Sequence, residues 1–471
     1  MKTRRELDSL GEKEVPAEAY YGIQTQRALE NFPVSGLREH PDFVRAYVMI
    51  KKAAALANME VGFLDPKIGE PIVQACDEVL EGALLDQFVV DVFQAGAGTS
   101  FNMNVNEVLA NRALEIIGRP RGDYKTIGPN DHVNMAQSTN DTFPTAMHLS
   151  TLMGLEKLFR VIEDLRDAFL RKGEEFADIL KSGRTHLQDA LPVTLGQEFR
   201  AYASAIDRAL KQLMIRREEI KEVALGGTAT GTGANTHPKY RELVVRKLSE
   251  ISSFGLKPAS DPFEALQSHL KIAAVSSGLK ELALELIRIA NDLRLLSSGP
   301  TTGLAEIQLP AVQPGSSIMP GKVNPVMCEC LDMIGFQIVG NDLTVSLAVQ
   351  AGQLELNVMM PVIIYNVLQS IDLLVNFLPV FTTKCVEGIR ANRERCTEYL
   401  EKNPSLATLL SPHIGYLAAA SIAKEALEKK MSVKKLVLEK GLLDKERIEE
   451  IFNPKNLLGP EGADRKHKKQ A

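Results

Sequence analysis

The chain has no tryptophan, and aromatic residues make up only 6% of its 471 positions. It has only five cysteines, none of them in a CxxC pair, and no cluster of His, Cys and Asp has the spacing of a zinc site. An odd number of scattered cysteines argues against a disulfide framework and favours a reducing compartment. We therefore expect a cytoplasmic protein that holds no metal.

Positive charge is not in excess either, because 55 lysines and arginines face 60 aspartates and glutamates, for a net charge of −5. Proteins that bind nucleic acid usually carry a strongly basic face, so we expect no nucleic acid partner. The basic run at residues 465–469 is better explained as a solvated chain end. No stretch approaches the roughly 18 uninterrupted apolar residues of a membrane span. The first eight residues lack the apolar run of a signal peptide, and we expect no membrane partner.

What the chain does have is long stretches of helical periodicity. The clearest is an apolar stripe with residues three and four apart from Leu279 to Leu296. Similar patterns predict helices over 42–61, 68–84, 104–118, 144–171, 192–223, 279–296, 326–340 and 341–388, the last interrupted near Pro361. Helices of about 30 residues would be about 45 Å long, more than one domain core needs. The sequence predicts an all-α, mainly helical protein with a long-helix bundle that associates with copies of itself. A monomeric bundle with one broad apolar face is the alternative.

Changes in composition predict three domains. Residues 1–140 combine short helices with an irregular arm of about 35 residues that has one or two short strands, and they predict a mixed, mainly helical N-terminal domain. Residues 141–400 hold the long helices and predict the central bundle domain. A shift near Asn403 and Pro404 opens a small C-terminal helical domain, residues 401–471. Its helices are expected over 415–430, from 432 and over 444–452, before a frayed tail.

Four polar, glycine-bearing loops interrupt the helical pattern, and each is expected at a helix end. They are residues 96–104, 130–141, 183–189 and 315–325. Helix N-termini present unpaired N–H groups and a positive dipole end, so several of them together would suit an anionic ligand. The last loop, GSSIMPGKVNP, is the least helix-like because it holds two glycines and two prolines. It is either a functional loop on a rigid scaffold or an ordinary surface connection.

Single residues in these loops also have simpler explanations. Ser138 and Thr139 suit helix N-caps, which is the commonest role of hydroxyl residues before a helix. A lone His186 is more often a structural histidine than a catalytic one, and a lone Lys322 is usually solvated.

Cofactor-binding patterns are absent from the sequence. The loop at 315–325 fails the P-loop pattern, because five residues instead of four separate its glycines and a valine follows its lysine. Residues 226–233 are rich in glycine but lack the preceding strand of a dinucleotide site. A serine nucleophile elbow is also missing. The pattern leaves chemistry on a small anion without a cofactor.

Residues 315–325 resemble the signature of the aspartase/fumarase superfamily, and the other three loops match its remaining active-site segments in order and spacing. The resemblance extends from Val15 into the C-terminal region. It implies three mainly helical domains and a homotetramer with a shared helical core, in which each active site draws residues from three subunits. It also implies a small dicarboxylate substrate and the reversible anti-elimination of ammonia or water to give fumarate, with no cofactor.

The same resemblance implies residue roles. Ser316 is the catalytic base, on a loop that closes over the substrate. Lys322 and Asn324 stabilise the enediolate that forms when the proton leaves. His186 is the third catalytic residue and contacts the leaving group or a carboxylate. The other substrate-binding residues that the resemblance implies are Thr99, Ser138, Thr139, Asn140, Thr185 and Ser317.

Two branches of the superfamily fit the sequence, one that eliminates ammonia from L-aspartate and one that eliminates water from L-malate. Residues 98–104 (GTSFNMN), residues 137–140 (QSTN) and Gly128, where fumarases often carry histidine, favour the ammonia branch. Met360 stands where that branch usually has glutamate, and it favours the water branch together with residues 362–366. We predict elimination of ammonia from L-aspartate, with a class II fumarase as the alternative. A non-catalytic relative is disfavoured because the catalytic residues are present.

Overall fold

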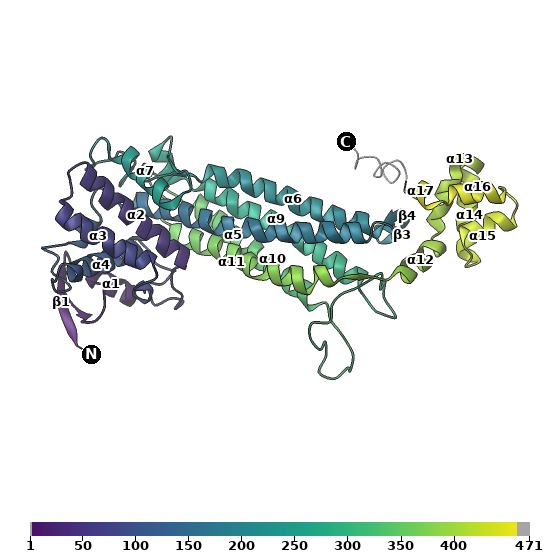
Figure 1. The fold of residues 1–471 in the computed structure, drawn as a ribbon, viewed down its shortest axis with the longest axis horizontal. Coiled ribbons are helices and arrows are strands. Elements are labelled where there is room, and N and C mark those ends of the chain that lie inside the picture. The colour runs from purple at the N-terminus through teal and green to yellow at the C-terminus, as the bar shows by residue number, and fades with distance from the viewer. Residues whose placement is uncertain (1, 459–471) are drawn as a thin grey trace. The chain divides into compact units, whose positions relative to one another are not determined.

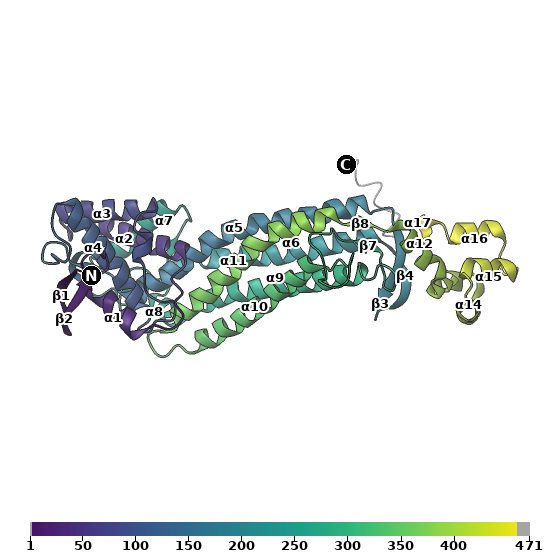
Figure 2. The same ribbon diagram turned by 90° about the horizontal axis from the view of Figure 1, so that it is seen from below.

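The protein is described by a computed structural model over residues 2–458. Helices dominate it, and its strands form short two-stranded pairs (Figures 1 and 2). The fold class is therefore mainly helical, as the sequence predicts. The chain divides into two compact units. Unit 1 comprises residues 1–160, 209–283 and 334–375, and unit 2 comprises residues 161–208, 284–333 and 376 onward. The three sequence-based domains stay a prediction.

Unit 1 opens with a β-hairpin followed by short helices. The hairpin pairs β1 (Thr3–Asp8) with β2 (Gly11–Pro16). The helices that follow are α1 (Ile23–Asn31), α2 (Pro41–Glu60), α3 (Pro66–Leu80) and α4 (Thr99–Ile116). Later in the chain come α7 (Tyr240–Ser252), α8 (Pro262–Gln267) and the parallel pair β5 (Glu222–Val223) and β6 (Lys257–Pro258). Phe43, Tyr47, Phe101 and Phe143 form an aromatic core with ring centroids 4.9–6.0 Å apart.

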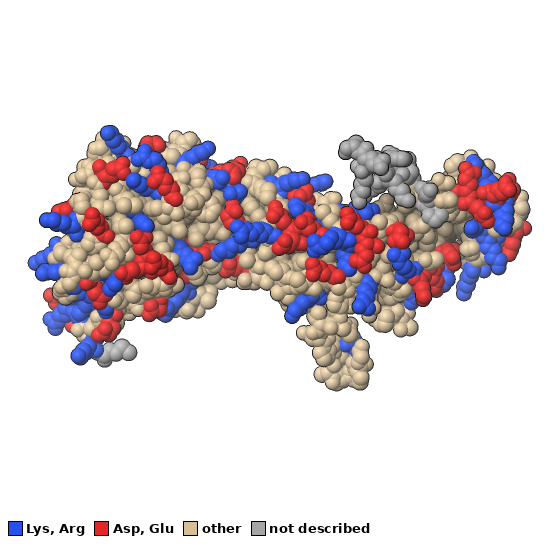
Figure 3. All heavy atoms as spheres, viewed as in Figure 1, with Lys and Arg blue, Asp and Glu red and all other residues tan. Residues whose placement is uncertain are grey.

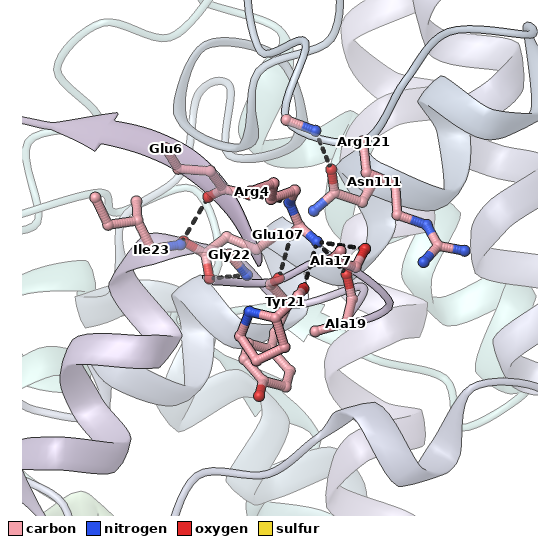
Figure 4. A network of polar contacts seen from close by, with 12 residues as sticks. Arg4, Glu6, Ala17, Ala19, Tyr21, Gly22, Ile23, Glu107, Asn111 and Arg121 are labelled. Atoms are coloured by element: carbon pink, nitrogen blue, oxygen red, sulfur yellow. Dashed lines mark hydrogen bonds and ion pairs between the residues drawn. The ribbon is translucent and has the colours of Figure 1, made fainter. Parts of the chain in front are cut away.

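Polar contacts hold the segment between β2 and α1, as Figure 4 shows. The Arg4 guanidinium donates to the carbonyl oxygens of four residues between 16 and 21. Buried Glu107 of α4 accepts from the N–H groups of Gly22, Gln24 and Thr25 at 2.8, 2.8 and 3.1 Å. Burial raises the pKa of Glu107 to about 7, and these hydrogen bonds oppose the rise. The carboxylate stabilises the N-terminus of α1, a helix that the sequence pattern does not predict.

The long helices each have residues in both units. They are α5 (Thr139–Glu175), α6 (Leu195–Glu219), α9 (Leu270–Leu296), α10 (Val326–Gln350) and α11 (Met360–Lys384). Within each unit, Figures 1 and 2 show the segments of these helices running alongside one another. The apolar stripe of α9 is buried along its length, as predicted. Within unit 1, Asp342 of α10 accepts from the Ser276 hydroxyl at 2.8 Å and pairs with Lys280 of α9. Such buried polar contacts help to fix how neighbouring helices align.

The helix predicted over 192–223 begins in the wrong place. Residues 188–194 form strand β4, which pairs with β3 (Leu180–Thr185), and α6 starts only at Leu195. The start is set by a capping box, because the Thr194 hydroxyl accepts from the Gln197 N–H at 3.1 Å while the Gln197 side chain accepts from the Thr194 N–H at 2.8 Å. The Thr-x-x-Gln spacing was visible in the sequence.

The break predicted near Gly340 is also wrong. α10 continues through Gly340 to Gln350, and the chain leaves the helix over residues 351–359. Asn357 explains this position, because its side-chain amide donates to the carbonyls of Ala348 and Val349 at 3.1 and 3.0 Å. Its oxygen accepts from the Met359 N–H at 2.8 Å, just before α11 begins. One asparagine therefore caps both helix ends.

Among the described helices, α11 and the turn after it (Met360–Gly388) have the length and composition of a membrane span. Of its most apolar window, 56% is buried within the protein. A core helix of a soluble protein passes the same test, and the side chains of Ile363, Ile364 and Val367 lie in the protein core. The apolar composition of α11 is thus explained by side chains that pack in the protein core.

The C-terminal part of unit 2 has a small core of its own. It follows the strand pair β7 (Ile307–Gln308) and β8 (Arg390–Ala391) and contains α12 (Arg393–Lys402), α13 (Ser411–Ile414), α14 (Tyr416–Glu428), α15 (Val433–Glu439), α16 (Lys445–Ile451) and α17 (Pro454–Leu457). Leu410, Ile422, Val437 and Ile448 pack together in this core. The helices predicted here are confirmed as α14, α15 and α16. The basic run at 465–469 lies outside the described residues.

Two histidines of unit 1 are expected to make the fold sensitive to acid. His269 is buried and His148 is partly buried, with His148 Nδ1 2.8 Å from the Glu222 carbonyl oxygen. Burial lowers the pKa of His148 to about 4 and that of His269 to about 3. An unfolded histidine titrates near about 6.5. Below that pH the unfolded chain binds protons that the folded chain does not, so the free energy of unfolding falls as the pH drops.

We expect each histidine to cost on the order of 2 kcal/mol of stability at pH 5 relative to pH 7. His148→Gln keeps a donor for the Glu222 carbonyl but cannot titrate, so the gap between its urea midpoints at pH 7 and pH 5 should be smaller than in the wild type. His413→Gln is the control, because His413 is exposed. If His148→Gln leaves the gap unchanged, the histidine explanation is wrong.

Candidate active site

The first polar loop turns tightly before α4. Gly98 has a φ of 88°, and a Cβ at this position would lie 2.1 Å from the Phe143 ring, so glycine is required here. α4 begins at Thr99, five residues before the predicted start. Thr99 is exposed, and its hydroxyl donates to the Gly96 carbonyl at 2.7 Å. The loop therefore places a hydroxyl at a helix N-terminus, where negative charge is favoured.

The second polar loop ends at the N-terminus of α5, as predicted. The Ser138 hydroxyl accepts from the Asn140 N–H at 3.2 Å, so Ser138 does act as a helix cap. The side-chain amide of Asn140 donates to the Ala229 carbonyl at 2.7 Å. Thr139 is nearly buried in the first turn. The glycine-rich segment 226–233 thus contacts this loop.

Asp141 ties the same loop to the glycine-rich segment. Its buried carboxylate accepts from the N–H groups of Ser138, Gly226 and Thr228 at 2.9, 3.0 and 2.9 Å. Burial raises the pKa of Asp141 to about 6, and the three backbone bonds oppose the rise. The sequence prediction missed Asp141, although the Ser-x-x-Asp spacing from Ser138 is a capping pattern that could have identified it.

The third polar loop is not at a helix end, which corrects the prediction. It is the turn of the β3–β4 hairpin, in which Thr185 pairs with Gln188 and only two residues connect the strands. These residues, His186 and Leu187, have φ values of 55° and 57°. Two successive left-handed residues are typical of a type I′ hairpin turn. The turn leaves Thr185 and His186 exposed at the tip of the hairpin.

Buried charges fix the base of this hairpin. Lys181 Nζ lies 2.7 Å from Glu198 Oε1 and 3.0 Å from Glu306 Oε2. Arg184 lies 2.9 Å from Glu306 Oε1, and the Glu306 side chain is completely buried. Burial raises the pKa of Glu198, while Lys181 opposes the rise. Two cations and two anions compensate one another, and removing one of them would leave a buried charge unpaired.

The fourth polar loop is closed at its neck. The Gly315 N–H donates to the Lys322 carbonyl at 2.8 Å, and the Asn324 side chain donates to the Gly315 carbonyl at 2.6 Å. Figure 1 shows the segment between α9 and α10 as a long loop that extends away from the helices. In Figure 3 it is a lobe of mostly tan atoms, since Lys322 is the single charged residue from 307 to 325.

The Ser316 hydroxyl lies in this loop with two donors aimed at its oxygen. Ser316 Oγ accepts from the N–H groups of Ile318 and Met319 at 3.2 and 3.0 Å. Donors in this position would stabilise negative charge on the oxygen and so favour loss of its proton. Ser316 and Lys322 line a common pocket of 460 Å³, together with largely apolar residues of 311–323.

The predicted site residues divide between the two units. Unit 1 holds Thr99, Ser138, Thr139 and Asn140, and unit 2 holds Thr185, His186, Ser316, Ser317, Lys322 and Asn324. In unit 1 the first two loops meet at buried Lys51, which bonds to side chains of both. In unit 2, Ser316, Lys322 and Asn324 share one loop, while His186 lies on the hairpin. Among residues 2–458, no group of three or more His, Cys, Asp or Glu is placed to hold a metal ion.

Lys51 and Glu306 were missed by the sequence prediction as well. Lys51 had a usable indication, because it stands among apolar residues of a helix whose buried side should hold no charge. Glu306 had none, since its importance comes from Lys181 and Arg184, which are distant in the sequence.

Two family models match the chain. One described as Lyase matches residues 11–340, and one described as Fumarase C C-terminus matches residues 406–459. The chain belongs to the aspartase/fumarase superfamily. The predicted resemblance is confirmed.

Curated relatives of this superfamily member are similar over nearly their whole length. An aspartate ammonia-lyase of Bacillus subtilis is 52% identical, covering 97% of this chain and 96% of the relative. An aspartate ammonia-lyase of Helicobacter pylori is 49% identical, covering 99% of this chain and 100% of the relative. One of Escherichia coli K12 is 48% identical, covering 97% of this chain and 96% of the relative. The similarity leaves no large part of the chain unmatched.

Solved structures show the same fold. A fumarate lyase:delta crystallin of Brucella melitensis, bound to cobalt, superposes with a TM-score of 0.93 and 50% identity, covering 96% of this chain and 99% of that one. A class II fumarase of Schistosoma mansoni superposes with a TM-score of 0.92 and 40% identity, covering 96% and 98%. The mainly helical fold is therefore that of the superfamily.

The neck of the fourth loop provides a test of its geometry. A Cβ at Gly315 would lie 2.4 Å from the Lys322 carbonyl oxygen, so Gly315→Ala must break the hydrogen bond that closes the neck. We expect trypsin to cleave the loop after exposed Lys322 several times faster in this variant. The wild type, in which this hydrogen bond is intact, is the reference. Equal cleavage rates in Gly315→Ala and the wild type would contradict the closed neck.

Proposed function

We propose that this chain catalyses the reversible elimination of ammonia from L-aspartate to give fumarate. One observation carries the proposal: the aspartate ammonia-lyases of Bacillus subtilis, Helicobacter pylori and Escherichia coli are 48–52% identical to it over at least 96% of both chains. Identity to the class II fumarase of Schistosoma mansoni is 40%. The chain is accordingly a carbon–nitrogen lyase, and the site residues below are assigned to that reaction.

Proton removal from C3 of the substrate is the difficult step, because carbon beside a carboxylate is only weakly acidic. Ser316 is the proposed base. The N–H groups of Ile318 and Met319 support this role, since they already point at Ser316 Oγ and would stabilise the alkoxide. A positioned base typically contributes about 10²–10⁴-fold to the rate. The mostly apolar loop around Ser316 would exclude water when it closes over the substrate.

The electron pair that stays on C3 when the proton leaves must then be stabilised as an enediolate on the neighbouring carboxylate. Lys322 is assigned to this enediolate, because it lines the same pocket as Ser316 and supplies the one positive charge of the loop. Asn324 is assigned beside it. Its Nδ2 donates one hydrogen to the Gly315 carbonyl, and the amide carries a second hydrogen for the substrate.

The remaining polar residues are assigned to the other end of the substrate. The second carboxylate is proposed to bind four hydroxyl residues, Thr99, Ser138, Thr139 and Ser317. Hydroxyl groups at helix N-termini and in loops can donate hydrogen bonds to such an anion. Asn140, His186 and Thr185 are proposed to contact the leaving amine and to direct the anti-elimination. These groups come from α4, α5, the β3–β4 hairpin and the fourth loop.

We propose that the site is completed by other copies of the chain in a homotetramer. An apolar stripe on α10 supports this proposal. Met333, Phe336, Gly340, Leu343 and Leu347 are spaced 3, 4, 3 and 4 apart, and the four large side chains are 58–62% exposed. The opposite side of α10 is already buried in the chain. A second apolar stripe at heptad spacing suits packing against a helix of another chain.

The domain division and compartment are part of the same proposal. The C-terminal domain is proposed to begin near residue 401, and the separate family match over 406–459 supports that boundary. The other domains are proposed as residues 1–140 and 141–400. A cytoplasmic location is proposed because Cys76, Cys328, Cys330, Cys385 and Cys396 are all free thiols, as is usual in a reducing compartment.

The function is tested by following fumarate at 240 nm with purified protein. We expect fumarate from L-aspartate, with release of ammonium in equal amount, and little or none from L-malate. Fumarate from L-malate but not from L-aspartate would contradict the proposal and favour the water-eliminating branch.

The oligomer is tested on the α10 stripe. Phe336→Glu places a charge in the α10 stripe, where the proposed contact with another chain lies. We therefore expect light scattering to detect species smaller than a tetramer and turnover to fall at least tenfold. Leu427→Glu is the control, because Leu427 is exposed on α14, outside the stripe. If Phe336→Glu still forms a tetramer, the α10 stripe does not form the proposed contact between chains.

A further inference from the structure

The ammonium of Lys51 is buried beneath the first two polar loops. Lys51 lies on α2 and has no exposed surface. Its Nζ donates to Asn102 Oδ1 at 2.7 Å, to Asn134 Oδ1 at 3.0 Å and to Gln137 Oε1 at 3.0 Å. An ammonium has three donors, and three amide oxygens meet them. The contacts thus satisfy a cation whose unpaired burial would be very costly.

The three amides belong to the elements that carry the proposed substrate groups. Asn102 lies in the first turn of α4, three residues after Thr99. Asn134 and Gln137 lie in the turn that leads to Ser138. The side-chain amides also donate hydrogen bonds that stabilise this turn. Gln137 Nε2 donates to the carbonyls of residues 133 and 135 within the turn, and Asn102 Nδ2 of α4 donates to Asn134 Oδ1. One cation therefore joins both loops.

The charge of Lys51 is not neutralised by these contacts, because all three acceptors are neutral amides. The titratable groups that face Lys51 are Asp141 of α5, Cys76 of α3 and Tyr47 of α2, whose ring centroid is 5.6 Å from Nζ. Asp141 is already bound by three backbone N–H groups. The Lys51 ammonium and the Asp141 carboxylate therefore offset one another in charge, and Lys51 acts on the two loops through the three hydrogen bonds that it donates.

We propose that Lys51 is a positioning residue that holds the Thr99 and Ser138 loops in register and favours binding of a substrate carboxylate there. This inference rests on the proposed function only in that the loops bind a dicarboxylate. Lys51 does not touch the substrate and takes no part in proton transfer. Its loss should weaken dicarboxylate binding more than it slows the chemical step.

The first experiment replaces the cation by an apolar side chain of similar length. We expect Lys51→Met to raise the dissociation constant of succinate at least tenfold by calorimetry, and to raise KM for L-aspartate by a similar factor while kcat changes less. Lys52→Met is the matched control. Lys52 is adjacent, on the same helix, and pairs with Asp77 outside the two loops. Succinate affinity like that of the control would overturn the inference, even if the melting temperature falls.

A second measurement serves if Lys51→Met does not fold. Burial lowers the pKa of Lys51 to about 7, and Asp141 opposes the shift. Succinate affinity of the wild type should therefore weaken as the pH rises from 6 to 9, because the neutral amine holds the loops less well. Lys51→Arg stays charged throughout, so its affinity should change less over this range. Parallel pH profiles for the two proteins would overturn the inference.

Succinate separates this inference from the proposed function. It has the dicarboxylate skeleton but no leaving group, so it reports binding whether the enzyme eliminates ammonia or water. If the wild type binds succinate but does not convert L-aspartate, the proposed function fails and the Lys51 test remains valid. If the wild type converts L-aspartate and Lys51→Met matches Lys52→Met, only the Lys51 inference fails.

Discussion

The Ser316 hydroxyl oxygen accepts hydrogen bonds from two nearby backbone N–H groups, and the proposed chemistry depends on this arrangement. A serine acts as a base only if its alkoxide is stabilised. Backbone N–H groups can stabilise the alkoxide without placing a further charged group beside it. The donors can point at Ser316 because the loop is closed at its neck by Gly315, Lys322 and Asn324. Glycine at 315 is what allows the two sides of the neck to meet.

The other polar loops are held in a different way, by buried charges. Lys51 joins the Thr99 and Ser138 loops, Asp141 binds three backbone N–H groups, and Glu306 fixes the hairpin through Lys181 and Arg184. Buried charges of this kind are costly to disturb, so they keep a site rigid. The Ser316 loop lacks such charges along most of its length, and its surface is mainly apolar and exposed. Under the proposed function, the loops held by buried charges bind the substrate and the Ser316 loop closes over it, which shelters the elimination from water.

Much of this arrangement could be predicted from sequence, and the errors have physical causes. The stripe of α9 was predictable because helical periodicity is a local property, and the signature loop was recognisable from eleven adjacent residues. The start of α6 was missed because β4 forms only by pairing with β3, and the end of α10 was missed because Asn357 caps it from nine residues away. Lys51 and Glu306 act through partners that the fold brings together. The apolar neighbours of Lys51 indicated a buried charge but not its partners, and the neighbours of Glu306 gave no indication.

In the proposed homotetramer, Ser316 from unit 2 of one chain and Thr139 from unit 1 of another are expected to complete each active site. Mixing two inactive variants, Ser316→Ala and Thr139→Val, tests it most directly, after the two are unfolded and refolded together. If the two residues come from different chains, some sites in the mixed tetramers will hold neither substitution, and about a quarter of the wild-type turnover should return. If one chain supplies both residues, every site keeps one defect and the mixture will be as inactive as its components, which would contradict the account.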